Sequence, residues 1–160
     1  MEVSGRLRGV RRRSMLSNLA SRDRGMKPSA LKERTKRFSV AIIKLVESLP
    51  KSLTGETIAT PLIRCGTAVG ACYRNTCKSQ NHYDFLARLN ITAEAADESC
   101  YWLEVIVDSK VLPEDQVLPH LHEGRRLKKI FVKSRKIAQK RQREEMGRHG
   151  KGYGDEDIPF

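Results

Sequence analysis

Histidine and cysteine side chains are the first candidates in this chain for catalysis or metal binding. His120 and His122 are two positions apart, and on a helix such residues point about 200° away from each other, so they do not readily share one metal ion. The four cysteines are Cys65, Cys72, Cys77 and Cys100. They show neither Cys-x-x-Cys nor a paired Cys and His spacing, so we interpret them as buried small residues in a reducing cytosol.

Acidic residues suited to proton transfer or metal binding gather in one segment with a helical pattern. They are Glu94, Asp97, Glu98, Glu104 and Asp108. If this helix is antiparallel to the preceding one about a turn at 79–81, position 98 lies level with Arg64. Two interpretations stay open: an ion pair of Arg64 with Glu98 or Glu94, or a solvated acidic helix face.

Motifs that would identify an enzyme are missing from the sequence. There is no Glu-x-x-His pair of a di-iron bundle, no Gly-x-x-x-x-Gly-Lys phosphate loop and no His-Glu-x-x-His. We therefore expect a non-enzymatic protein that holds no metal ion and no cofactor.

A basic run at 125–137 is the clearest sign of binding chemistry. Its apolar residues keep to one stripe while cations cover the remaining surface, which is typical of a helix that contacts phosphate groups. The residues expected to contact nucleic acid are Arg125, Arg126, Lys128, Lys129, Lys133, Arg135 and Lys136. Such contacts give affinity without sequence choice and weaken steeply with salt. A solvated helix face is the other interpretation.

The distribution of charge also favours an anionic partner. The 160-residue chain has a net charge of +12. Residues 1–37 hold twelve basic and three acidic groups, residues 38–124 seven and eleven, and residues 125–160 twelve and five. Basic segments at both ends favour RNA or DNA as partners. Aromatic residues suited to base stacking are scarce, since Phe131 fits the core, so base-specific reading of single strands is not expected.

Four amphipathic segments predict an all-α protein, an up-down antiparallel four-helix bundle. Pro61 lies inside the second segment, at about 56–77, and predicts that the regular helix begins near Thr60 or kinks there. Thr54 is a candidate cap for this helix. We expect a disordered basic tail at 1–28, the bundle at 29–145 and a flexible, Gly-rich tail at 146–160.

The stretch 64–74 clusters small residues in an apolar period and has an arginine at each end. A glycine inside a helix costs about 1 kcal/mol relative to alanine. Close packing or a binding surface should therefore offset the cost of Gly66 and Gly70. We interpret the stretch as a packing and assembly element, in which the glycines admit a neighbouring helix or a large aromatic side chain. The residues assigned to packing or assembly are Arg64, Gly66, Gly70, Tyr73, Arg74, Glu94 and Glu98.

Several segments together resemble a known family. They are 43–50, 62–74, 84–85, 94–98 and 101–103. They are similar to the bacterial four-helix-bundle proteins found in intervening sequences of large-subunit ribosomal RNA genes, and to the related accessory variability proteins of diversity-generating retroelements. The resemblance implies a bundle that forms homo-oligomers, pentameric in the best-known cases, with RNA or reverse transcriptase partners. The chain departs from the family pattern at Pro61, Cys72 and Asn75.

The sequence thus predicts a cytoplasmic, oligomeric bundle that binds nucleic acid non-specifically. A protein-interaction scaffold that recruits a partner such as a reverse transcriptase is the alternative. No run of about 18 apolar residues indicates a membrane-spanning helix, and a membrane-surface helix is disfavoured because the bundle needs the apolar stripe. The Arg-rich start faintly resembles an organellar transit peptide, but we interpret it as a disordered tail or as translation upstream of a start at Met26.

Overall fold

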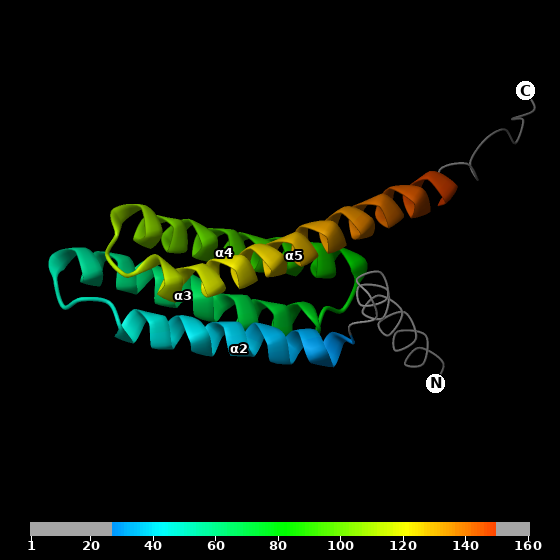
Figure 1. Ribbon diagram of the computed structural model, residues 1–160. Helices are drawn as coiled ribbons and strands as arrows, with labels where there is room; N and C mark the ends of the chain where they lie inside the picture. The colour runs from blue at the N-terminus through cyan, green and yellow to red at the C-terminus, as the bar shows by residue number, and fades with distance from the viewer. Residues whose placement is uncertain (1–26, 150–160) are drawn as a thin grey trace, which may run out of the picture.

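The computed structural model describes residues 27–149, which form four helices packed side by side as an antiparallel bundle (Figure 1). The helices are α2 (Pro28–Glu47), α3 (Leu53–Thr76), α4 (His82–Ser109) and α5 (Glu114–His149). Successive helices are neighbours because their connections are short, and α2 and α5 pack together less extensively than the successive pairs do. The predicted four-helix bundle is confirmed. Residues 1–26 and 150–160, which hold most of both predicted tails, lie outside the described residues.

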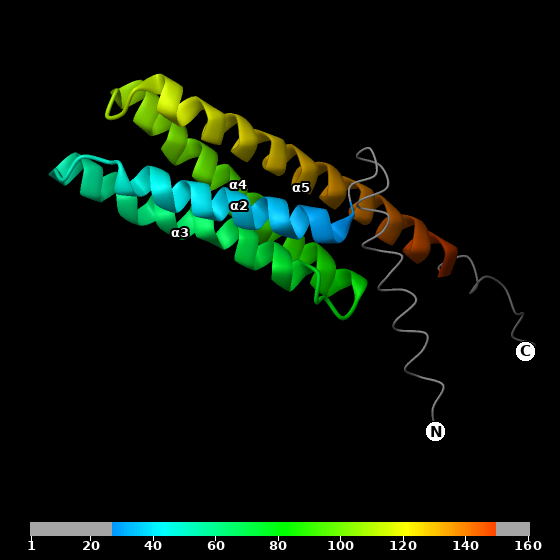
Figure 2. The same cartoon turned by 60° about the horizontal axis from the view of Figure 1, so that its bottom comes forward.

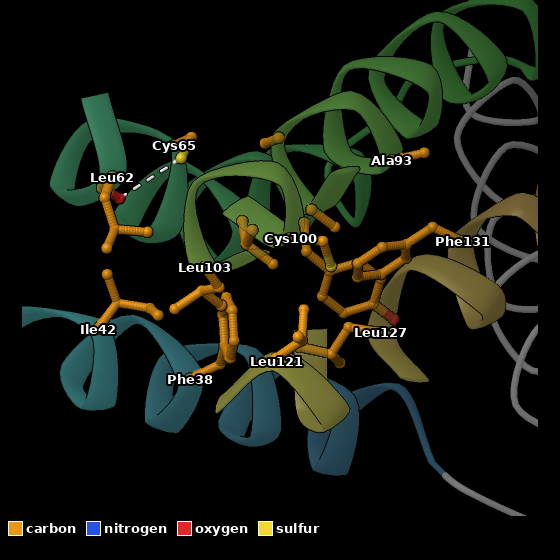
Figure 3. Packing of buried hydrophobic residues seen from close by; sticks show 14 of the residues in the cluster. Phe38, Ile42, Leu62, Cys65, Ala93, Cys100, Leu103, Leu121, Leu127 and Phe131 are labelled. Atoms are coloured by element: carbon orange, nitrogen blue, oxygen red, sulfur yellow. Dashed lines mark hydrogen bonds between the residues drawn. The ribbon is translucent and has the colours of Figure 1, made fainter. Parts of the chain in front are cut away.

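One face of each helix supplies the core, as the periodicity predicts. Figure 3 shows these side chains converging between the helices, among them Ile42 of α2, Leu62 of α3, Leu103 of α4 and Phe131 of α5. These four have essentially no exposed surface. The ring of Tyr73 lies 5.6 Å from that of Phe131, which joins α3 to α5 across the bundle. Burial of this continuous apolar surface is the main force that holds the helices together.

Gly66 and Gly70 let α3 approach α2 closely. A Cβ atom on Gly66 would lie 2.6 Å from Cγ2 of Ile42, and one on Gly70 would lie 3.0 Å from Oγ of Ser39. The hydroxyl of Ser39 donates to the carbonyl oxygen of Gly66 at 3.0 Å. The idea that the glycines admit an aromatic side chain is wrong, because the nearest atoms belong to α2.

α3 begins at Leu53, and its cap differs from the predicted one. The hydroxyl of Ser52 accepts a hydrogen bond from the backbone N–H of Gly55 at 3.2 Å, so Ser52 caps the helix and Thr54 does not. The chain turns so tightly here that a Cβ atom on Gly55 would lie 2.0 Å from the carbonyl oxygen of Pro50. Only glycine fits this position.

Pro61 lies inside α3, so the predicted start near Thr60 is wrong. Ile58 and Leu62 on either side of it are buried in the core. The cap at Ser52 and this burial offset the roughly 3 kcal/mol that a proline costs within a helix.

Replacing Ser52 with alanine should lower the free energy of unfolding by about 1 kcal/mol, because the N–H of Gly55 would have no acceptor. Thr54→Ala is the matched control, since Thr54 is also exposed at the start of α3, and it should be nearly neutral. Urea unfolding followed by circular dichroism measures both. Equal effects of the two substitutions would contradict the assignment of the cap.

α5 is the longest helix, with 36 residues, and therefore spans about 54 Å. Figures 1 and 2 both show its carboxyl-terminal part extending beyond the end formed by the other helices. Within residues 27–149, no helix combines the length and apolar character needed to cross a membrane.

Candidate nucleic-acid interface

The seven predicted contact residues of α5 divide into two rows on different faces of the helix. Three of the seven predicted contact residues turn toward α4 and form what we call the inner row. Their partners give the pairs Arg125–Glu104 at 2.8 Å, Lys128–Asp97 and Arg135–Asn90 at 2.5 Å. The hydrogen bond to Asp97 raises the pKa of Lys128. The inner row therefore has its partners on α4, and its two ion pairs are exposed enough that each contributes less than about 1 kcal/mol.

The other four predicted residues, Arg126, Lys129, Lys133 and Lys136, are exposed and have no hydrogen-bond or ion-pair partner within the described chain. Their spacing of three and four residues continues to Lys140 and Arg143. Residues with this spacing share one face of a helix, drifting by only about 20° per seven residues. These six cations form the outer stripe. It is about 26 Å long at the helical rise per residue.

No acidic residue interrupts the outer stripe. Residues 124–143 contain ten basic residues and no Asp or Glu. Lys140 has one distant acidic neighbour, with its Nζ 3.9 Å from Glu144 Oε1, and its side chain is 80% exposed. The outer face of α5 thus presents a row of positive charge that Glu144, beside Lys140, offsets in part. Sequence reasoning missed Lys140 and Arg143, because the apolar stripe that marked the basic run fades beyond Ala138.

A bidentate ion pair joins α2 to α5 where these helices pack loosely against each other. Nε of Arg34 lies 2.6 Å from Oε1 of Glu123, and Nη2 lies 2.9 Å from Oε2. The pair lies in a groove between α2 and α5 that His120 also lines. Burial lowers the pKa of His120, whereas His122 is exposed. No pattern in the sequence indicates the Arg34–Glu123 pair, because 89 positions separate the two residues.

Three of the four cysteines are small core residues, as predicted. Cys65, Cys77 and Cys100 are buried and Cys72 is half-buried, and all four are free thiols. Burial raises the pKa of Cys100 to about 11 and also raises the pKa values of Cys65 and Cys72. These three thiols stay protonated at neutral pH and are weak nucleophiles there. In the part of the chain that the structure describes, no three His, Cys, Asp or Glu side chains are placed to hold a metal ion.

The predicted ion pair between Arg64 and Glu98 is present, with Nη2 of Arg64 2.7 Å from Oε1 of Glu98. Their side chains are 71% and 41% exposed, so the pair contributes less than about 1 kcal/mol to stability. Glu94 instead accepts a hydrogen bond from the side-chain amide of Asn90. The acidic residues of α4 are mostly paired, rather than forming a purely solvated face.

The residues assigned to packing or assembly separate into buried and exposed groups. Gly66, Gly70 and Tyr73 are buried within the single chain, where they fix how α3 packs on its neighbours. Arg64 and Arg74 lie on the outer face of α3 and are exposed. Only the exposed group is accessible to a second subunit.

Comparison with solved structures shows a protein of similar fold. No family model matches the chain, and no curated protein matches it. A crystal structure of a protein of unknown function from the S23 ribosomal protein family of Bacteroides thetaiotaomicron VPI-5482 is similar, with a TM-score of 0.63 and 25% sequence identity. The similarity covers 68% of this chain and 97% of that one. This chain therefore shares its four-helix fold with a protein of the S23 ribosomal protein family.

Proposed function

We propose that this protein is a non-enzymatic, oligomeric helical bundle that binds RNA or DNA without sequence specificity through α5. The observation that carries the proposal is the outer stripe, Arg126, Lys129, Lys133, Lys136, Lys140 and Arg143, which lies in a segment, 124–143, that contains no acidic residue. The inner row has a different role, because its members already bond to α4.

The spacing of the outer stripe suits a phosphate backbone. Successive cations are three or four residues apart, which corresponds to about 5 Å along the helix. A row of Lys and Arg at such intervals meets several phosphate groups and releases their counterions, which supplies affinity for any sequence. The basic residues near both ends of the chain would add to the attraction by their charge.

The structural neighbour supports RNA as the natural polyanion, because its family is named for ribosomal proteins. We further infer a relationship to the bundle proteins of ribosomal RNA intervening sequences and to the accessory variability proteins of diversity-generating retroelements. The segments at 62–74 and 94–98 support it, since they hold the closely packed glycines and the Arg64–Glu98 pair.

Exposed aliphatic side chains support self-association. Val40, Ile43 and Ile63 are 43%, 36% and 37% exposed, on adjacent helices. Because Ser39 is bonded to Gly66, Ile43 and Ile63 lie at nearly the same level of the bundle. Apolar surface of this kind favours a homo-oligomer, and a pentamer is the state that the family resemblance implies.

The same aliphatic surface also favours the second candidate function, a scaffold that recruits a protein partner such as a reverse transcriptase. The two functions use different faces of the bundle. Substitutions in the outer stripe that abolish nucleic-acid binding but leave a protein partner bound would favour the scaffold as a separate activity.

The wild-type protein should bind mixed-sequence RNA and DNA fragments with similar affinity, and binding should weaken at least tenfold between about 50 and 200 mM salt. Fluorescence anisotropy with labelled fragments of several sequences measures this. Absence of binding at low salt, or affinity that does not change with salt, would overturn the proposal.

A further inference from the structure

A small hollow lies between the start of α4 and the later part of α5. It is lined by Tyr83, Leu86 and Asn90 from α4 and by Arg135, Gln139 and Gln142 from α5. Its volume is about 270 Å³. That is just below the roughly 300–1,000 Å³ of pockets for drug-sized ligands, so it accommodates a single planar ring system better than an extended molecule.

Tyr83 offers an aromatic ring at the edge of this hollow. Tyr83 is 77% exposed, whereas Phe38, Phe85 and Phe131 are buried in the core. No other aromatic ring of the described chain packs against it. An exposed ring next to a hollow is the feature on which nucleobases stack, and stacking of this kind tolerates any base.

Unpaired amide groups lie on the opposite wall. Gln139 and Gln142 make no hydrogen bond within residues 27–149. Each glutamine amide has both an acceptor and donors, so it complements the mixed donors and acceptors at the edge of a base. Arg135 donates a hydrogen bond to Asn90 Oδ1 at 2.5 Å, which keeps its guanidinium group beside the hollow.

The hollow adjoins the outer stripe. Lys136 precedes Gln139 by three positions and Arg143 follows it by four, so both cations neighbour Gln139 on the surface of α5. A strand whose phosphates contact these cations would bring its bases within reach of Tyr83. A paired base cannot enter, because its edge and faces are already occupied within the duplex.

We propose that this hollow binds one unpaired nucleobase, stacked on Tyr83 and bonded by the glutamine amides, from a single strand of RNA or DNA held by the outer stripe. The inference rests on the proposed function and adds a preference for single strands. It departs from the expectation drawn from the sequence, in which aromatic residues suited to base stacking are scarce.

The test uses the full chain and compares Tyr83→Leu with Tyr101→Leu. Tyr101 is the matched control, since it is 57% exposed on the same helix but lies outside the hollow. The probes are a labelled 20-nucleotide mixed-sequence single strand and the blunt duplex of the same sequence. Tyr83→Leu should weaken single-strand binding by roughly 5- to 50-fold and leave duplex binding unchanged, because stacking acts only on an unpaired base. Tyr83→Phe keeps an aromatic ring and should bind the single strand as tightly as the wild type does.

Each alternative result separates this inference from the proposed function. If Tyr83→Leu binds the single strand as tightly as wild type while binding stays salt-dependent, the base site is wrong and the phosphate-binding function stands. An equal reduction in affinity for Tyr83→Leu and Tyr101→Leu, or for single strand and duplex, would also overturn the base site. If the wild-type protein binds neither probe, both proposals fail.

Discussion

Replacing Gly66 with leucine should lower the free energy of unfolding by about 2–3 kcal/mol. The first added atom alone would lie 2.6 Å from Ile42, whose side chain is completely buried, so α2 and α3 must separate or Ile42 must leave its position. Leucine has a better helix propensity than glycine, but this offsets only about 1 kcal/mol of the lost stability. Urea unfolding followed by circular dichroism at 222 nm measures the change.

Gly147→Leu is the matched control, because a Cβ atom at Gly147 meets nothing within 4 Å. It should be neutral or slightly stabilising. The loss of stability in Gly70→Leu should lie between those of Gly66→Leu and Gly147→Leu, since a Cβ atom there would lie 3.0 Å from the hydroxyl of Ser39. If Gly66→Leu unfolds at the urea concentration of the wild type and keeps its oligomeric mass, the stretch 64–74 is a functional surface and not a packing element.

Replacing Lys129, Lys133 and Lys136 together with glutamine should weaken nucleic-acid binding by roughly 10- to 100-fold at about 100 mM salt. The three lysines are exposed and have no partner among residues 27–149, so the substitutions break no hydrogen bond or ion pair of the folded protein. Fluorescence anisotropy measures affinity, and thermal melting should show an unchanged midpoint.

The control variant has the same net charge as the outer-stripe variant, but its three lysines are replaced elsewhere on the protein. Lys44, Lys51 and Lys110 are exposed and lie outside α5, so replacing these three with glutamine should weaken binding only slightly. An equal reduction in affinity for the two triple variants would mean that net charge, and not the outer stripe, determines binding.

The fold was predictable because each helix has its own apolar periodicity, which can be recognised in the sequence without knowing which helices pack together. The beginning of α3 was not predictable in this way. Its start depends on Ser52 meeting the N–H of Gly55 and on how closely Gly55 approaches Pro50. Those interactions exist only in the folded chain, so the sequence does not reveal them. Pro61 alone therefore led to a predicted helix start that is too late.

The candidate site was predictable as a basic helix but not as two rows. Seven cations in a run look alike in the sequence. Only the packing of α4 against α5 shows that Arg125 and Lys128 meet Glu104 and Asp97, whereas Lys129 meets no acidic residue of the described chain. The hollow beside Tyr83 likewise needs two helices in register, because its walls come from segments that lie far apart in the sequence.

The dependence of affinity on salt tests the central proposal most directly. For a duplex, the slope of log K against log salt concentration changes by about 0.9 for each phosphate group that the protein ceases to neutralise. Replacing Lys129, Lys133 and Lys136 with glutamine should therefore make the slope shallower by about 2–3, while the control triple variant keeps the wild-type slope. Parallel plots for the wild type and the outer-stripe variant would contradict the proposal that α5 binds the nucleic-acid backbone through this face.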